Sequence, residues 1–243
     1  MLSMAGQRIA LAAGEEQLSF YINYLLEYKL FGYTFYLTTT HISIIIVMIL
    51  ILIFAVCANR KIKNADEIPG TFQNIVELIV EMLDSMVNGI MGPNARRFVN
   101  YLSTIFIFIL VSNISGLLGL RPPTADYGVT LPLGLITFAL IHYNGIRKNK
   151  MEHLTNLFKP FPLLFPINLI GELAVPLSLS LRLFGNVMSG TVMMGLLYGL
   201  TPIFVQIGIP AVLHVYFDIF SGAIQTYVFC MLTMVYVNDK IAD

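Results

Sequence analysis

The sequence LSLSLRLFGN, residues 177–186, places one arginine, Arg182, in the middle of a long apolar stretch. Residues 165–176 precede it with Glu172 as their one charged member, and residues 187–200 follow it without a charge. A guanidinium at the centre of a membrane-spanning helix costs about 2.5–3.5 kcal/mol on insertion scales. It also stays charged and can only donate hydrogen bonds. We therefore expect Arg182 to act as a fixed positive charge that faces a polar path or a mobile carboxylate.

A structural role is the alternative for Arg182. The side chain would then reach a lipid headgroup or tie neighbouring helices together. Reaching a headgroup is hard here, because the next break in the apolar stretch is GLTP, residues 199–202, several helical turns away. The functional interpretation fits the sequence better.

The whole chain is strongly apolar. Of its 243 residues 57% are hydrophobic and 12% are charged, and the mean hydropathy is +0.78. This composition is typical of a membrane protein and not of a soluble domain. The formal net charge is zero, so charge gives no reason to expect a nucleic-acid partner. Cys57 and Cys230 both lie in apolar runs, and we expect neither a disulfide nor a metal site from them.

The apolar runs predict an all-α polytopic membrane protein with about five transmembrane helices. The expected spans are residues 41–58, 98–120, 129–146, 165–200 and 203–237. The last two are longer than a helix perpendicular to the membrane needs. We therefore expect them to be tilted or bent and to form a hairpin that turns near Thr201 and Pro202.

Two further segments lie outside these spans. Residues 72–91 carry apolar side chains at the helical repeat and acidic side chains on the other face, which predicts an amphipathic helix on the membrane surface or on a partner's flank. Residues 1–40 are rich in Phe and Tyr, as is typical of a segment at the membrane–water interface. The chain thus divides into an interfacial segment, 1–40, and an integral membrane domain, 41–243.

The basic residues indicate the orientation of the chain. Five spans place the following on one side of the membrane: Arg60, Lys61, Lys63, Arg96, Arg97, Arg147, Lys148, Lys150, Lys159 and Lys240. The other side keeps Arg8, Lys29 and Arg121. Since cytoplasmic segments carry the excess of Lys and Arg, we expect the N-terminus outside and the C-terminus in the cytoplasm.

Polar residues recur on one face of each of the last two expected helices. On the first helix the face comprises Ser178, Arg182, Asn186 and Ser189, with Gly185 and Gly190 leaving room for close approach. On the second it comprises His214, Asp218, Ser221 and Gln225. A hairpin brings Gln225 to a depth close to that of Arg182, and it places Asp218 about two turns nearer the outer surface.

These polar residues have a structural interpretation as well as a functional one. Gln225 and the serines could form a satisfied polar seam between two helices. An intramembrane carboxylate such as Asp218 instead indicates a proton or cation path. His214 fits either role. Glu172 could line an inner path or pair with a cation at the interface.

The stretch 177–186 closely resembles the signature of subunit a of F-type ATP synthases, the membrane stator that faces the c-ring. Further parts of the chain resemble elements of the same family in the same order: Asn113 with residues 116–119, residues 122–124 with Asp126 and Thr130, residues 224–229, and residues 232–236. The resemblance extends over residues 40–238, and residues 1–40 match only loosely.

The resemblance implies roles for individual residues. Arg182 is similar to the stator arginine of the family, and Gln225 to its polar partner on the last helix. Asp218 falls where the family places an ionisable residue of the outer half-channel. Many members carry an acid nine residues past the arginine, where this chain has Thr191, so we expect Asp218 to supply the acidic function at that depth.

A mechanism and partners follow from the same resemblance. An outer half-channel delivers an ion to a carboxylate on each c-subunit and an inner half-channel removes one, with Asn186 and Asn113 as candidate lining residues. Arg182 between them favours the ionised carboxylate and blocks a direct leak. The implied partners are the c-ring, the peripheral-stalk b subunits and H⁺ or Na⁺ as the translocated ion, in a bacterial plasma membrane.

Other functional classes fit the sequence less well. A self-contained secondary transporter driven by H⁺ or Na⁺ would also use intramembrane Arg and Asp, but the sequence has no internal repeat and no matching pair of broken helices. It also lacks the phosphate-binding loop Gly-x-x-x-x-Gly-Lys-Ser/Thr, the zinc motif His-Glu-x-x-His and the nucleophile motif Gly-x-Ser-x-Gly. We therefore expect a non-catalytic subunit without a metal or cofactor.

Overall fold

The computed structural model describes residues 24–30, 33–63, 70–149, 161–200 and 209–241. Within these ranges five helical stretches are long and apolar enough to cross a membrane, which confirms the predicted polytopic helical fold. In chain order the elements are β1 (Tyr24–Leu30), β2 (Tyr33–Thr38), α2 (Thr39–Lys63), α3 (Thr71–Met91), η1 (Gly92–Asn94), α4 (Ala95–Ile114), η2 (Ser115–Leu118), η3 (Pro123–Ala125), α5 (Tyr127–Asn149), η5 (Pro162–Leu164), α7 (Phe165–Leu200), α9 (Ile209–His214), the π-helix η6 (Val215–Ser221) and α10 (Gly222–Ile241).

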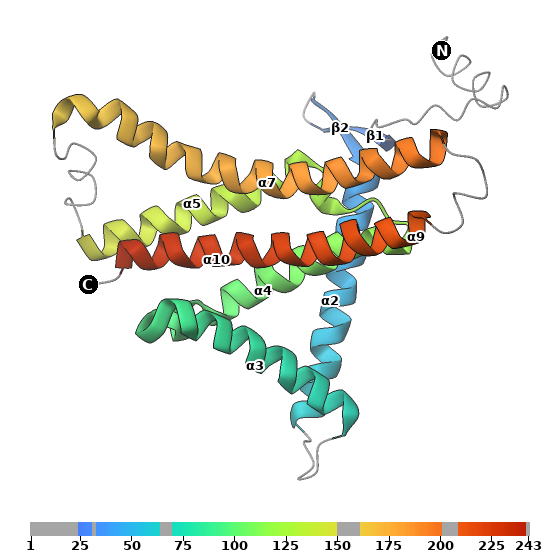
Figure 1. The fold of residues 1–243 in the computed structure, drawn as a ribbon, viewed down its shortest axis with the longest axis horizontal. Coiled ribbons are helices and arrows are strands. Elements are labelled where there is room, and N and C mark those ends of the chain that lie inside the picture. The colour runs from blue at the N-terminus through green and yellow to red at the C-terminus, as the bar shows by residue number, and fades with distance from the viewer. Residues whose placement is uncertain (1–23, 31–32, 64–69, 150–160, 201–208, 242–243) are drawn as a thin grey trace.

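Three long helices, α5, α7 and α10, lie side by side and carry the polar residues of the last two spans (Figure 1). Helix α4 packs against α10, and α3 packs against both. Helix α2 crosses this arrangement at a steep angle. The buried core lies mainly between α3, α4 and α10, where Val87, Ile109 and Met234 are fully enclosed, and it extends to α5 and α7. Many other large apolar side chains, such as Leu52 on α2, stay exposed on the outer faces, as expected of lipid-facing helices.

Helix α7 bends, as its length requires. Its 36 residues would span about 54 Å if straight, whereas the hydrocarbon core of a bilayer is about 30 Å thick. Pro176 lies inside the helix and has no N–H to donate to the carbonyl of Glu172, and Figure 1 shows the first half of α7 curved. Gly134 of α5 packs at this point, because a Cβ there would lie 2.6 Å from the Pro176 carbonyl oxygen.

The last helix is less regular than the sequence indicates. In the described part of the chain it begins at Ile209 and ends at Ile241, and residues 215–221 form a π-helix. The expected turn near Thr201 and Pro202 lies outside the described residues. A π-helix widens one turn and is frequently found at functional sites. The apolar spacing that predicted residues 203–237 as one helix carries no sign of this wider turn.

Helix α3 begins at Thr71 and ends at Met91, close to the amphipathic helix expected at 72–91. It buries Val76, Leu83 and Val87 against the bundle and exposes its acidic side chains. The apolar surface is wider than this contact, however, since Leu78 is 66% exposed.

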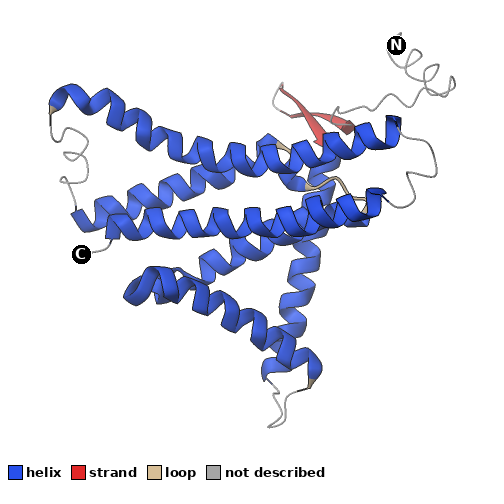
Figure 2. Ribbon diagram, viewed as in Figure 1, coloured by secondary structure: helices blue, strands red, loops and turns tan. Residues whose placement is uncertain are grey.

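The N-terminal region contains the one strand pair of the described chain, the antiparallel hairpin β1–β2 (Figure 2). The aromatic composition of residues 1–40 did not predict these strands, and residues 1–23 lie outside the described part. Helix α2 continues past Ala58 to Lys63, because basic side chains in the last turn interact favourably with the free carbonyls there. Helix α4 ends at Ile114, well before the expected residue 120.

Candidate functional site

The polar residues of α7 and of the last helix are held in register by two contacts. The Ser221 hydroxyl donates a hydrogen bond to Asn186 Oδ1 at 3.0 Å. One turn further along, Gly190 packs on Phe217 so closely that a Cβ would lie 3.3 Å from the Phe217 Cβ. The helices run antiparallel, so four residues back along α7 match four residues forward along α10.

This register places Arg182 level with Gln225, each one turn from the Asn186–Ser221 hydrogen bond. In the same way Ser189 is level with Asp218. Each of these three polar residues of α7 therefore lies opposite a polar residue of the last helix, at the same depth along the contact.

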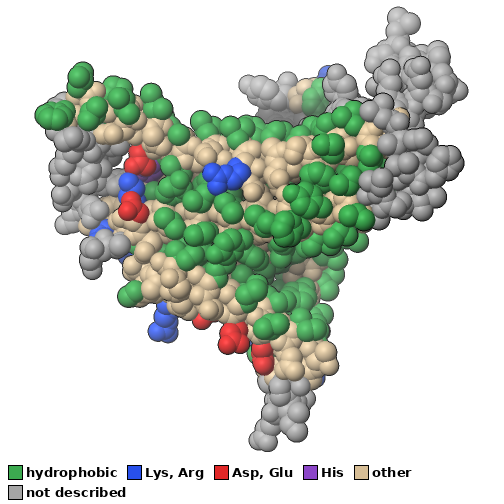
Figure 3. All heavy atoms as spheres, viewed as in Figure 1, with side chains coloured by type: hydrophobic (Ala, Val, Ile, Leu, Met, Phe, Trp, Pro, Cys, Tyr) green, Lys and Arg blue, Asp and Glu red, His purple; other side chains and the backbone are tan. Residues whose placement is uncertain are grey.

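The side chain of Arg182 is exposed, and it makes no hydrogen bond or ion pair with any described residue. Its neighbours Leu179 and Leu183 are buried and fix the helix, whereas Ser178 and Leu181 share its exposed side. Figure 3 shows a mostly apolar face over α7 and α10 with one isolated basic group near its middle, acidic and basic groups together at one end of this layer, and acidic groups along α3. A guanidinium on such a face needs a partner, and the described residues do not supply one.

Next to Arg182 the surface of α7 is hollowed into an open groove of about 470 Å³. The groove is lined by Phe184, Gly185, Met188, Ser189, Val192, Met193 and Leu196. A Cβ at Gly185 would meet nothing within 4 Å, so this glycine leaves space outside the chain, whereas Gly190 accommodates Phe217 within it. The groove is almost entirely apolar and suits the flank of another helix. Gln225, across the contact, is half-buried and makes no hydrogen bond within the described chain.

The π-helix carries the second ionisable group of the site. The His214 Nδ1 and Asp218 Oδ2 atoms are 2.7 Å apart, and both side chains are half-buried. If Nδ1 carries the proton and donates to the carboxylate, Nε2 can accept from the Tyr198 hydroxyl, 3.3 Å away on α7. Asp218 also lies against Gly116 of η2, where a Cβ would stand 3.5 Å from the Asp218 Cγ. The three side chains form a hydrogen-bonded row from α7 to the loop after α4.

Asn113 is fully engaged inside the protein. Its Nδ2 donates to the Gly222 carbonyl at 3.0 Å and to the Thr226 hydroxyl at 3.3 Å, and its Oδ1 accepts from the Thr124 hydroxyl at 2.7 Å. It is 2% exposed. These contacts join α4, η3 and the start of α10 immediately beside the π-helix.

Glu172, near the start of α7, is paired with a cation at the other end of the helix contact. Lys240 Nζ donates to Glu172 Oε1 at 2.9 Å, and His142 Nε2 lies 3.9 Å from Oε2. Of the two roles that the sequence left open for Glu172, the structure contains the cation pair.

The sequence of this chain was compared with those of known protein families. The family model described as "ATP synthase A chain" matches residues 41–238. The chain belongs to the ATP synthase A chain family. It is 38% identical over 229 residues to "ATP synthase subunit a, sodium ion specific" of Propionigenium modestum, covering 87% of this chain and 76% of that one. It is also 34% identical over 235 residues to ATP synthase subunit a of Bacillus pumilus, covering 87% and 95%.

Membership of the ATP synthase A chain family makes the chain an ion-translocating membrane subunit of an F-type ATP synthase. Together with the five membrane-spanning helices, it makes the subunit a multi-pass membrane protein. The match also favours an ATP synthase subunit over a self-contained transporter.

Three residues of this ATP synthase subunit that contact the site carry no clear signal in the sequence, and a fourth, Lys240, carries one. Tyr198 was missed because a tyrosine near the end of an apolar run is typical of an interfacial anchor. Thr124 and Thr226, the partners of Asn113, were missed because isolated threonines in apolar helices carry no pattern. Lys240 could have been paired with Glu172, since an antiparallel hairpin brings the start of one helix to the end of the other.

Proposed function

We propose that this ATP synthase subunit is the stator against which the c-ring turns. Two offset half-channels, one open to each side of the membrane, load and unload the carboxylate of each passing c-subunit. Arg182 stands between them as the fixed charge that couples ion flow to rotation and so to ATP synthesis elsewhere in the complex. A passing carboxylate ionises beside the guanidinium, and the guanidinium repels any cation that would cross directly.

The observation that carries this proposal is the unpartnered exposure of Arg182 in the middle of α7. In the described part of the chain no carboxylate compensates it, although Glu172 and Asp218 lie on the same two helices and are each paired elsewhere. An intramembrane cation is stable only if a partner compensates it. The open groove beside it, with Gly185, gives a neighbouring helix room to bring a carboxylate close.

We further propose that the row Tyr198–His214–Asp218 belongs to the outer half-channel. Hydroxyl, imidazole and carboxylate groups within hydrogen-bond distance of one another are the groups that pass protons or hold a cation in a membrane. Asp218 is level with Ser189, and Ser221 with Asn186, so polar groups continue from this row towards Arg182 and Gln225. Thr191 supplies no acid, and Asp218 takes that function.

The inner half-channel runs on the opposite side of Arg182, past Ser178 and Glu172. The distribution of Lys and Arg supports an orientation with the N-terminus outside and the C-terminus in the cytoplasm of a bacterial cell. The partners are the c-ring along α7 and the b subunits of the peripheral stalk. The ion is H⁺ or Na⁺; the similarity to a sodium-specific relative supports testing Na⁺ first, and the selecting ligands are expected mainly on the c-subunit.

The test is ATP-driven ion uptake into inverted membrane vesicles that contain the whole complex, with wild type compared to Arg182→Ala. We expect coupled uptake to fall by about 100-fold or more, because the charge that couples ion flow to rotation is gone, while the complex still assembles. Passive leak through the joined half-channels should rise. Repeating the assay with and without Na⁺ identifies the ion.

Arg96→Ala is the matched control, since Arg96 is an exposed arginine at the start of α4, outside the site. Its uptake should equal that of wild type. If Arg182→Ala assembles and pumps normally, the arginine is structural and the proposal is wrong.

A further inference from the structure

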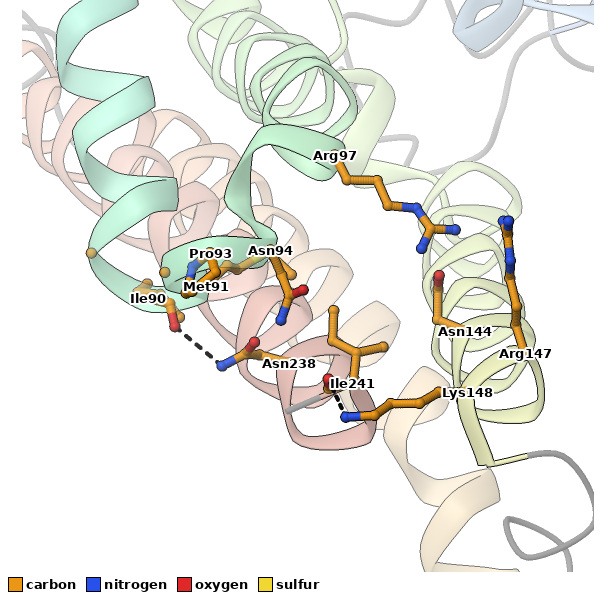
Figure 4. Close-up of a pocket in the computed structure, with 12 residues that line it drawn as sticks. Ile90, Met91, Pro93, Asn94, Arg97, Asn144, Arg147, Lys148, Asn238 and Ile241 are labelled. Carbon is orange, nitrogen blue, oxygen red and sulfur yellow. Dashed lines mark hydrogen bonds between the residues drawn. The ribbon is translucent and has the colours of Figure 1, made fainter. Parts of the chain in front are cut away.

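A second cavity lies at the end of the bundle where the α3–α4 turn meets the last turns of α5 and α10. Its volume is about 680 Å³, and none of its lining residues belongs to the site around Arg182. The side chains that give it its chemistry are Arg97, Asn144, Arg147, Lys148 and Asn238 (Figure 4). The proposed ion path assigns no role to this cavity.

The cavity is basic. Three cationic side chains line it, Arg97 from α4 and Arg147 and Lys148 from α5, and no acidic residue is among its described lining residues. Figure 4 shows Arg97 reaching from α4 towards Asn144 and Arg147 across the opening. Lys148 Nζ also donates to the Ile241 carbonyl at 2.8 Å, which ties α5 to the end of α10. Guanidinium groups arranged around an opening suit phosphate oxygens, which they can bind in a bidentate manner.

The cavity also presents acceptors that need donors. Asn144 is 3% exposed; its Nδ2 donates to the Leu140 carbonyl at 2.7 Å, and its Oδ1 has no partner in the described chain. Asn238 repeats the arrangement: Nδ2 donates to the Ile90 carbonyl at 3.3 Å, and Oδ1 is buried without a partner there. A buried acceptor without a donor costs about 1–3 kcal/mol, so two of them beside one cavity indicate a ligand that donates hydrogen bonds.

The position of the cavity restricts the ligand further. Arg147 and Lys148 lie in the last turn of α5, and Asn238 in the last turn of α10, so the opening is where apolar spans give way to charged ends. Lipid phosphates lie at this level of a bilayer, and basic pockets between helices there bind anionic headgroups.

We propose that this cavity binds the headgroup of an anionic phospholipid whose phosphodiester is joined to a hydroxyl-bearing group, as in phosphatidylglycerol. The phosphate oxygens accept from Arg97 and Arg147, and the headgroup hydroxyls donate to Oδ1 of Asn144 and of Asn238. The bound lipid bridges the α3–α4 turn to the ends of α5 and α10. Phosphatidylcholine has the same phosphate but a compensating positive charge and no donor, and it is rejected.

The experiment is native mass spectrometry of the full-length chain in mild detergent with equal amounts of phosphatidylglycerol and phosphatidylcholine. We expect wild type to retain phosphatidylglycerol about tenfold more than phosphatidylcholine. Arg97→Gln combined with Arg147→Gln should remove this preference. Asn144→Leu should reduce binding of phosphatidylglycerol while leaving that of phosphatidic acid, which lacks the headgroup hydroxyls, within about twofold.

The matched control is Arg60→Gln combined with Arg96→Gln, which removes the same charge from exposed basic residues that do not line the cavity. It should keep the tenfold preference. Circular dichroism and size exclusion confirm that each variant is folded. Inorganic phosphate is the competing probe: if it displaces the lipid at millimolar concentration, the site takes free phosphate and the lipid proposal is overturned.

Two further results overturn the proposal. One is equal retention of both lipids by wild type, and the other is an unchanged preference in the double variant that lacks Arg97 and Arg147. Loss of phosphatidylglycerol from the assembled complex, when the separate chain retains it, would assign the cavity to a protein partner instead. Retention in both forms supports the lipid.

Discussion

Two polar regions meet the last helix at the same level, Asn113 at Gly222 and Thr226 and Arg182 at Gln225, and they are built in opposite ways. Both side-chain polar atoms of Asn113 are matched, since three hydrogen bonds join them to Thr124, Gly222 and Thr226. Around Arg182 and Gln225 neither side chain has a partner in the described chain. In an apolar medium a polar group is either satisfied within the protein or is held for something outside it. The first region thus stabilises the fold, and the second depends on a partner.

The largest effect that separates the two regions is expected at Arg182. Arg182→Gln should abolish coupled ion uptake, because a neutral amide cannot stabilise an ionised carboxylate as a guanidinium does. The free energy of unfolding of the purified chain in mild detergent should stay within about 0.5 kcal/mol of the wild-type value, because no internal contact is lost. Differential scanning measurements alongside vesicle uptake check both parts.

Gln225→Leu tests the same region from the other helix. This substitution should also leave the free energy of unfolding unchanged while it lowers the rate of coupled ion uptake. A large loss of stability in either variant would show that these side chains have internal partners and would remove the contrast.

The second largest effect is expected at Asn113, where a substitution should lower stability and not coupled uptake. Asn113→Leu leaves three buried groups without their partner and should lower the free energy of unfolding by about 3 kcal/mol or more. Uptake per assembled complex should change far less than the amount of complex that assembles. The measurement is thermal unfolding together with immunoblotting of assembled complex.

Asn100→Leu is its control on the same helix. Asn100 is exposed, and its side chain makes no hydrogen bond with any described residue; only its backbone carbonyl accepts one, from the Thr104 hydroxyl. The free energy of unfolding of this control variant should match that of wild type within about 0.5 kcal/mol.

Two glycines sharpen the comparison at the level of backbone packing. Gly134→Ala places a Cβ 2.6 Å from the Pro176 carbonyl oxygen and should destabilise the chain by about 2 kcal/mol, because backbone must move to relieve the contact. Gly185→Ala meets nothing within 4 Å and should be neutral or slightly stabilising, since alanine favours a helix. If a partner helix lies in the groove, Gly185→Ala nevertheless lowers coupled uptake, whereas Gly134→Ala lowers stability first.

Much of the fold follows from the sequence because the membrane restricts the choices. Apolar runs must become spans, and the start and end expected for residues 165–200 are those of α7. The ends of the other helices differ, since basic residues extend α2 and a left-handed Gly119 follows the short turn that closes α4. The β1–β2 hairpin and the π-helix depend on local hydrogen bonding, to which hydrophobic periodicity is insensitive.

The site was predictable only as faces of helices. Spacing of three and four residues correctly grouped His214 with Asp218 and indicated that Asn186 would meet the last helix, as the Ser221 hydrogen bond shows. Spacing alone could not distinguish the buried Asn113 from the exposed Arg182, because burial depends on which helices pack on which side. The functional roles of these residues stay predictions.

The smallest effect is expected at the pair that ties the start of α7 to the end of α10. Glu172 and Lys240 are half-buried and 2.9 Å apart, so a double-mutant cycle with Glu172→Gln and Lys240→Met should give a coupling energy of about 1 kcal/mol. If His142, whose Nε2 lies 3.9 Å from the same carboxylate, is protonated, it lessens the loss when Lys240 is changed alone. The same variants separate the two interpretations of Glu172. If the pair is structural, both substitutions lower the free energy of unfolding and leave ion uptake per assembled complex unchanged. If Glu172→Gln slows uptake while Lys240→Met does not, the carboxylate belongs to the inner half-channel and the pairing with Lys240 is secondary.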